Sequence, residues 1–152
     1  MSKKTIILAS DHAGFPLKNA LKVHLEAAGY ATVDAGTDST ASCDYPVYAE
    51  AGCRKLLEGE GDLCILCCGT GVGMSMAANK IRGIRAACCS DVYSARFTRL
   101  HNDANVLCLG ARVLGEGLAW DLVEAFITTE FEGGKHARRV GLIMDLEARN
   151  RE

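Results

Sequence analysis

Short apolar runs alternate along the chain with segments in which hydrophobic residues recur at helical spacing. The runs are Thr5–Ser10, Ala31–Ala35, Leu63–Cys68, Ile84–Cys89 and Val106–Leu109. Each run is continuous and rich in Ile, Val, Leu, Ala or Cys, a pattern that favours strands buried on both faces of a parallel sheet. The chain is therefore predicted to contain five strands.

Six segments between and after these runs have helical spacing. The first carries a stripe of Leu17, Leu21 and Leu25, begins at Pro16 and stops at Gly29. The next begins near Asp44, the third holds Met74 to Ile81, the fourth runs from about Asp91 to Leu100, the fifth holds Leu118 to Phe126, and the last starts at about residue 134. Because nothing marks a linker, residues 1–152 are predicted to form a single α/β domain, a three-layer α/β/α sandwich around a Rossmann-like five-stranded parallel sheet.

The charge balance argues against nucleic-acid and membrane partners. Among 152 residues, 17 are Lys or Arg and 19 are Asp or Glu, so the net charge of -2 provides no basic surface for a phosphodiester backbone or an anionic membrane. No apolar run approaches the roughly 20 residues that cross a bilayer. We therefore expect a cytoplasmic protein.

Eight cysteines raise the question of disulfides and metal sites. Six of them lie inside the predicted strands, where thiols pack as small hydrophobic groups, so disulfides are not expected. Cys64 and Cys67 form a CxxC pair, but three residues along a strand place their side chains on opposite faces. Buried packing is therefore favoured over zinc or redox use of this pair, and no metal or other cofactor is expected.

Polar residues follow four of the predicted strands, at the ends where open parallel sheets bind ligands. Asp11 and His12 follow the first strand, Tyr45 lies after the second, residues 68–73 follow the third, and Arg112 follows the fifth. These residues are predicted to share the carboxyl edge of the sheet. Asp11 is suited to orient sugar hydroxyls and His12 to contact phosphate, although a plain N-cap explains Asp11 almost as well.

The sharpest local feature is the sequence Cys-Gly-Thr-Gly-Val-Gly at residues 68–73. Alternate glycines that leave a strand and open a helix expose backbone N–H groups to an anion or an oxyanion. The spacing matches neither the dinucleotide fingerprint nor a P-loop. Because a helix N-terminus lowers the pKa of a thiol, Cys68 is a candidate base or nucleophile. The alternative is a tight strand-to-helix turn with a buried thiol.

Two further groups have competing interpretations. Lys135 and Arg139 are four residues apart on the last helix, so they either close on a phosphate monoester or form an ordinary solvated basic face. His101 and Asn102 precede the fifth strand, at the amino edge of the sheet, which is the wrong edge for meeting Cys68 in the same subunit. His101 is therefore either a capping or surface residue, or it reaches a neighbour's site across a symmetric interface.

Taken together, six motifs resemble one known family over essentially the whole chain. They are Ser10–Gly14, Asp44–Pro46, Cys68–Gly73, Ala78–Lys80 with Gly83–Ala86, His101–Asn105, and Gly133–Gly134 followed by basic residues. Their order is similar to that of the ribose-5-phosphate isomerase type B family, which also contains allose-6-phosphate and galactose-6-phosphate isomerases. The resemblance implies a metal-free aldose-to-ketose isomerisation through a cis-enediol(ate), without a cofactor, in the pentose phosphate pathway.

The resemblance also implies roles for individual residues. Cys68 is the base that moves the proton between C1 and C2, and His101 opens the furanose ring. Thr70 and the amides of Gly69, Gly71, Val72 and Gly73 stabilise the enediolate oxygen. Asp11, Tyr45 and Asn102 hold hydroxyls, while His12, Arg112, Lys135 and Arg139 surround the phosphate. The family's homodimer, with sites shared between subunits, would explain the position of His101, and pairing of dimers into a tetramer stays open.

One residue departs from the family pattern. Many members have arginine where this chain has Lys135, which offers a point charge in place of a bidentate fork. The leading hypothesis is interconversion of ribose 5-phosphate and ribulose 5-phosphate, and a six-carbon substrate, allose 6-phosphate or galactose 6-phosphate, is the alternative within the same chemistry. A non-catalytic sugar-phosphate-binding module and a thiol redox sensor are alternatives from other classes.

Overall fold

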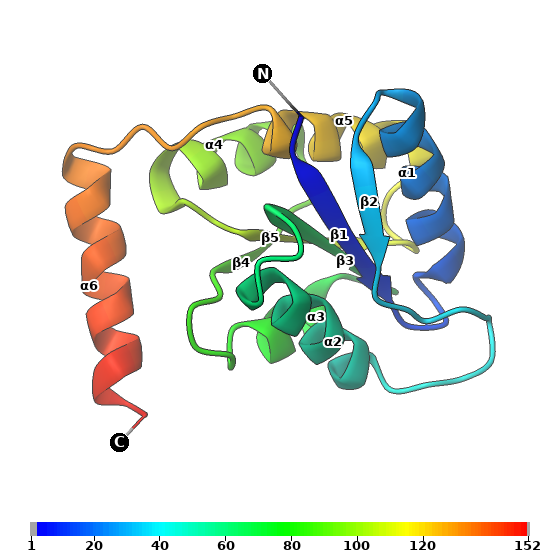
Figure 1. The fold of residues 1–152 in the computed structure, drawn as a ribbon, viewed down its shortest axis with the longest axis horizontal. Coiled ribbons are helices and arrows are strands. Elements are labelled where there is room, and N and C mark those ends of the chain that lie inside the picture. The colour runs from blue at the N-terminus through cyan, green and yellow to red at the C-terminus, as the bar shows by residue number, and fades with distance from the viewer. Residues whose placement is uncertain (1–2, 152) are drawn as a thin grey trace.

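The computed structural model describes residues 3–151 as an alternation of strands and helices (Figure 1). The strands are β1 (Thr5–Ser10), β2 (Ala31–Asp34), β3 (Leu63–Cys68), β4 (Ala86–Cys88) and β5 (Val106–Gly110). The helices are α1 (Phe15–Ala27), α2 (Tyr45–Leu57), α3 (Val72–Ala78), α4 (Val92–Asn102), α5 (Glu116–Ile127) and α6 (Lys135–Arg149). Within this described range, none of the helices has the length and apolar character needed to cross a membrane. All strand pairs are parallel in the order β2-β1-β3-β5-β4, which confirms the predicted α/β class and its five-stranded parallel sheet.

Each face of the sheet has its own hydrophobic core. On one face, Ile6 and Leu8 of β1 pack with residues of α1, α4 and α5, and on the other, Ile7 and Ala9 pack with residues of α2 and α3 (Figure 1). Because neighbouring residues of a strand point to opposite faces, the continuous apolar runs of β1, β3 and β5 supply both cores at once.

The eight cysteines are free thiols. Cys64 and Cys67 belong to opposite cores, as their spacing along β3 predicts. This confirms the prediction that the two side chains of the CxxC pair pack on opposite sides of the sheet.

The sheet order corrects one expectation about burial. β2 and β4 are the edge strands, so each has a single neighbouring strand and both are partly exposed. The predicted Ile84–Cys89 strand shortens to Ala86–Cys88, and Cys88, which was expected inside a buried strand, is exposed. Apolar composition alone does not distinguish an edge strand from a central one.

Two helix boundaries also differ from the expectation. α3 ends at Ala78, so Ile81 packs into the core from the loop beyond the helix. α4 continues to Asn102. The next residue, Asp103, is its C-cap and takes the left-handed conformation with a φ of 46°. His101 and Asn102 therefore lie in the last helical turn rather than in a loop, just before the amino end of β5.

The last helix lies apart from the sheet. α6 packs beside α4, beyond the β4 edge (Figure 1). Its Leu142, Ile143 and Leu146 side chains are 51%, 46% and 52% exposed. Large apolar side chains gathered on one exposed helix are typical of a surface that contacts another protein.

Candidate active site

Cys68 lies at the carboxyl end of β3, where residues 68–73 turn into α3 and form what we call the thiol turn. The side chain is buried, and its Sγ accepts a hydrogen bond from the Gly71 amide at 3.1 Å. Gly71 has a φ of +81°, and a Cβ there would lie 3.0 Å from the Leu109 backbone, so only glycine fits without strain. The thiol turn therefore directs a backbone N–H donor at the Cys68 sulfur.

Burial makes five other thiols unreactive. It raises the pKa of Cys53 to about 12 and that of Cys89 to about 11. Complete burial also raises the pKa of Cys64, Cys67 and Cys108. These thiols stay protonated at neutral pH and act as small packing groups.

Arg112 follows β5 and lies across the thiol turn. A Cβ built on Gly69 would be 3.1 Å from the Arg112 Nη1 atom, so the guanidinium passes directly over that glycine. The Arg112 amide donates to the Gly69 carbonyl at 3.0 Å, and a Cβ on Gly110 would meet the Thr70 carbonyl oxygen at 2.6 Å. This close approach of two backbones places an arginine where it can bind an anion beside the thiol.

Thr70 is exposed on the thiol turn and is hydrogen-bonded inside it. Its Oγ1 accepts the Val72 amide at 3.3 Å, and its carbonyl accepts the Cys88 thiol at 3.7 Å. The Gly71 and Val72 amides thus both have partners within the turn. To bind a ligand oxygen, either amide has to exchange its internal partner for that oxygen.

Tyr45 begins α2 and covers Gly73 of the thiol turn. A Cβ on Gly73 would lie 2.6 Å from a carbon of the tyrosine ring, so the missing side chain makes room for the aromatic group. The Asp44 side chain makes no capping hydrogen bond at the start of α2. Tyr45 therefore contacts the thiol turn through its ring.

Asp11 and His12 follow β1 at the same edge. Asp11 is buried, and its Oδ1 accepts the Gly14 amide at 2.9 Å, so the carboxylate stabilises the turn before α1. The N-cap of α1 is Gly14 and has no side-chain capping hydrogen bond, so the interpretation of Asp11 as a plain N-cap is wrong. The His12 Nδ1 accepts the Cys43 amide at 3.2 Å, which assigns the proton of the neutral ring to Nε2. The Nε2–H group is then the one that can donate to a ligand.

Four of the predicted site residues lie elsewhere. They are His101 and Asn102 at the end of α4, and Lys135 and Arg139 on the first turns of α6. The His101 ring stacks on His136 of α6 with 3.9 Å between ring centroids, which joins the two helices. β5, whose five residues span ~13 Å, separates the end of α4 from the thiol turn. The predicted phosphate-binding cations are therefore divided, with His12 and Arg112 at one place and Lys135 and Arg139 at the other.

Comparison with known proteins identifies the family. Residues 6–143 match the family model described as Ribose/Galactose Isomerase. The chain belongs to this family. It is similar to ribose-5-phosphate isomerase B of Escherichia coli, with 47% identity over 96% of this chain and 98% of that protein.

Two solved structures of the family agree with this assignment. Ribose-5-phosphate isomerase B from Clostridium thermocellum superposes with a TM-score of 0.94 at 46% identity, over 95% of this chain and 98% of the other. The Mycoplasma genitalium enzyme, solved with bound ribulose-5-phosphate, has a TM-score of 0.89 at 40% identity, over 95% of this chain and 96% of the other. The chain is therefore a ribose-5-phosphate isomerase B or a related sugar-phosphate isomerase.

Two arginines to which the sequence analysis gave no role fix the end of α4 in this isomerase. The Arg99 side chain is buried, and its Nη1 donates to the Asp103 carboxylate at 2.8 Å and to the Ala104 carbonyl at 2.7 Å. Arg85 donates to the Asp103 carbonyl at 2.7 Å. The helical turn that carries His101 is thus held by charged hydrogen bonds, for which the four-residue spacing of Arg99 and Asp103 is the only local signal.

Lys18 is another residue that sequence reasoning missed. Its side chain is fully buried, and its Nζ donates to Asp34 Oδ1 at 2.7 Å and to the Thr37 carbonyl. The side chain of a lysine in an amphipathic helix is normally expected to point into solvent. Lys18 is buried because its partner, Asp34, lies at the end of β2. Lys18 ties the segment after β2 to α1 at the edge that carries the thiol turn.

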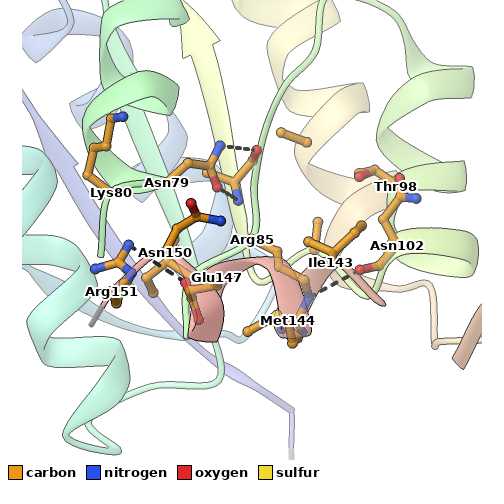
Figure 2. Close-up of a pocket in the computed structure, with 14 residues that line it drawn as sticks. Asn79, Lys80, Arg85, Thr98, Asn102, Ile143, Met144, Glu147, Asn150 and Arg151 are labelled. Atoms are coloured by element: carbon orange, nitrogen blue, oxygen red, sulfur yellow. Dashed lines mark hydrogen bonds and ion pairs between the residues drawn. The ribbon is translucent and has the colours of Figure 1, made fainter. Parts of the chain in front are cut away.

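A cavity of about 710 Å³ lies between α6 and the body of the isomerase (Figure 2). Its walls include Arg85, Ile143, Met144 and Glu147. Among the predicted site residues, Asn102 lines it. The cavity therefore belongs to the α6 side of the isomerase and not to the thiol turn.

Proposed function

We propose that this isomerase interconverts ribose 5-phosphate and ribulose 5-phosphate through a cis-enediol(ate), with Cys68 as the base. The thiolate takes the C2 proton of the open-chain aldose and returns it to C1, while a hydroxyl proton moves from O2 to O1. Thr70 and the amides of Gly69, Gly71, Val72 and Gly73 stabilise the enediolate oxygen. The observation that supports this role is the Gly71 amide directed at the Cys68 sulfur, with Arg112 lying over the same turn.

The substrate binds, in this proposal, between two copies of the chain. Asp11 and Tyr45 of one copy hold hydroxyls, and His12 and Arg112 bind the phosphate. The second copy supplies His101 to open the ring, Asn102 to hold a hydroxyl, and Lys135 and Arg139 to complete the phosphate site. The separation of these groups along β5 and the exposed apolar face of α6 support a homodimer, or a tetramer built from it. A cytoplasmic location and a place in the pentose phosphate pathway stay predictions.

The base is tested by turnover of ribose 5-phosphate in Cys68→Ala, with Cys88→Ala as the matched control because Cys88 is the exposed thiol beside the same turn. We expect a loss of about 1,000-fold for the first variant, at the scale of a removed acid–base group, and little change for the second. If Cys68→Ala folds normally and keeps most of its turnover, Cys68 is not the base. Sugar-phosphate binding by the wild-type protein without turnover would favour a binding module instead.

Metal independence has a separate test. Dialysis against a chelator should leave wild-type turnover unchanged, and a loss that is restored by a divalent cation would contradict the metal-free mechanism.

The sugar is tested by comparing kcat/KM on ribose 5-phosphate, allose 6-phosphate and galactose 6-phosphate. The bound ribulose-5-phosphate of the Mycoplasma relative favours the five-carbon pair, whereas the family description also names galactose. This chain departs from the family pattern at Lys135, where many members have arginine, and a lysine contacts the phosphate as a point charge rather than as a bidentate fork. A higher kcat/KM on either six-carbon sugar would make that sugar the substrate.

Sharing of the site is tested by mixing Cys68→Ala with His101→Ala protein after subunit exchange. In a mixed dimer one site contains both substitutions and the other contains neither. Random exchange of equal amounts therefore restores about a quarter of wild-type activity if sites are shared. No recovery, once exchange is demonstrated, would place His101 and Cys68 in separate functions.

A further inference from the structure

His136 covers one face of the His101 ring. The two imidazoles are nearly parallel, with an angle of 8° between ring planes and 3.9 Å between centroids, and His136 is only 7% exposed. On another side, the Phe97 ring meets His101 edge-on at 5.1 Å. Glu132 Oε2 lies 3.6 Å from His101 Nε2. The ring proposed to open the sugar is thus contacted by three groups of its own chain and stays 37% exposed.

The side chains of His101, Glu132 and His136 do not fit a shared metal ion in this arrangement. One ligand atom each of His101, Glu132 and His136 lie within 4.8 Å of one another. An imidazole nitrogen directs its lone pair in the plane of its ring, so two parallel stacked rings cannot both point at one ion between them. Stacking is therefore the contact that the geometry supports.

The segment that carries His136 is fixed to α4 before any partner binds. The Glu132 amide donates to the Leu100 carbonyl at 3.0 Å, and Arg99 Nε donates to the Thr129 carbonyl at 3.2 Å. His136 itself lies in the first turn of α6, two residues after Gly134. The backbone that carries the His136 ring is therefore held in place beside His101 by hydrogen bonds to α4.

The surroundings of His136 also favour the uncharged form of its ring. Burial lowers the pKa of His136, and the neighbouring His101, Lys135 and Arg139 lower it further, while Glu132 opposes them. An uncharged ring can stay face to face with His101 whether or not His101 is protonated, because two stacked cations would repel each other.

We propose that His136 is a positioning residue that fixes the ring plane of His101 for opening of the substrate's furanose ring. The inference rests on the proposed function, in which His101 opens that ring in the site of the partner subunit. His136 acts through the orientation of His101 and does not take part in proton transfer between C1 and C2.

Two assays on the full-length protein separate these steps. Net conversion of ribose 5-phosphate requires ring opening. Incorporation of deuterium from D₂O at C1 of ribulose 5-phosphate does not, because that ketose is acyclic. In His136→Ala we expect net conversion to fall by about 10- to 100-fold, the cost of misplacing a catalytic group, with deuterium incorporation within about two-fold of wild type. His136→Phe keeps a flat ring at this position and should recover most of the net conversion.

The chain offers a matched control in His24 of α1, which stacks on Trp120 at 5.1 Å and lies 3.0 Å from Glu116, neither of which belongs to the proposed site. His24→Ala should leave both assays unchanged. His101→Ala, measured in parallel, tests the proposed function itself.

The outcomes are distinct. If His101→Ala loses net conversion but His136→Ala does not, the positioning role is wrong and the proposed function stands. Equal losses in both assays for His136→Ala, or a Phe variant as impaired as the Ala variant, would also overturn positioning by stacking. If His101→Ala keeps its net conversion, the assignment of ring opening to His101 is wrong and the inference falls with it.

Discussion

Replacing Asp34 by Asn should destabilise the isomerase strongly, because it removes the counter-charge of a fully buried lysine. Lys18 has no exposed surface, and its Nζ lies 2.7 Å from Asp34 Oδ1. Removing one partner of a buried pair costs about 3–5 kcal/mol. The Asp34 side chain is 29% exposed and the Thr37 carbonyl still accepts from Lys18, so we expect the lower end, about 3 kcal/mol, as the loss in the free energy of unfolding in urea.

The loss of stability in Asp34→Asn should also depend on pH in a defined direction. Burial raises the pKa of the Asp34 carboxyl, but hydrogen bonds from Lys18 and the Gly36 amide and the charges of Lys18 and Lys22 outweigh it, so the pKa is lowered overall. A lowered pKa contributes stability above the unfolded value, about 3.9, and this stability is lost as the pH falls through the folded value. The difference between wild type and Asp34→Asn should therefore be largest near neutral pH and shrink below about pH 4.

The control for this prediction is Lys22→Gln. Lys22 Nζ is 3.7 Å from Asp34 Oδ2 and is 37% exposed, so its loss should cost less than about 1 kcal/mol. Lys18→Met, which removes the buried charge itself, should be milder than Asp34→Asn. An Asp34→Asn variant that loses no more stability than Lys22→Gln would refute the idea that Lys18 depends on this carboxylate.

Three further outcomes follow from the packing of the thiol turn. Gly73→Ala should raise KM with a small effect on stability, because its Cβ would meet only the movable ring of Tyr45 at 2.6 Å, and steady-state kinetics with urea unfolding checks this. Gly110→Ala should lower stability by about 1–3 kcal/mol, since its Cβ would lie 2.6 Å from the Thr70 carbonyl oxygen, and a melting temperature equal to wild type would contradict it. Mild alkylation followed by mass spectrometry should label Cys88 before the five thiols whose pKa is raised most by burial, namely Cys53, Cys64, Cys67, Cys89 and Cys108, which should react only after unfolding.

The central part of the fold is predictable from the sequence for a physical reason. β1, β3 and β5 are buried almost completely, so they stand in the sequence as continuous apolar runs. The turn after β3 is equally predictable, because its alternate glycines indicate close backbone approaches such as that of Gly71 to the Leu109 backbone.

What the sequence hides depends on partners that are distant along the chain. The edge positions of β2 and β4 follow from strand order, which local composition does not encode. α4 extends to Asn102 because Asp103, and not a glycine, takes the left-handed position, where its carbonyl accepts a hydrogen bond from Arg85, a residue that precedes β4. Lys18 is buried only because Asp34 lies beside it. Each of these outcomes requires knowledge of a neighbour contributed by another element.

The two groups of site residues are each built by a single chain before any dimer forms. Close backbone contacts hold the thiol turn, and Arg99, Asp103 and the His136 stack hold the end of α4. In the proposed dimer, association therefore joins two prepared halves with little rearrangement of either. Dilution below the dimer dissociation constant should then lower the specific activity while the circular dichroism spectrum stays constant. A monomer shown by sedimentation to keep full specific activity would mean that one chain brings His101 and Cys68 together, which β5 between them opposes.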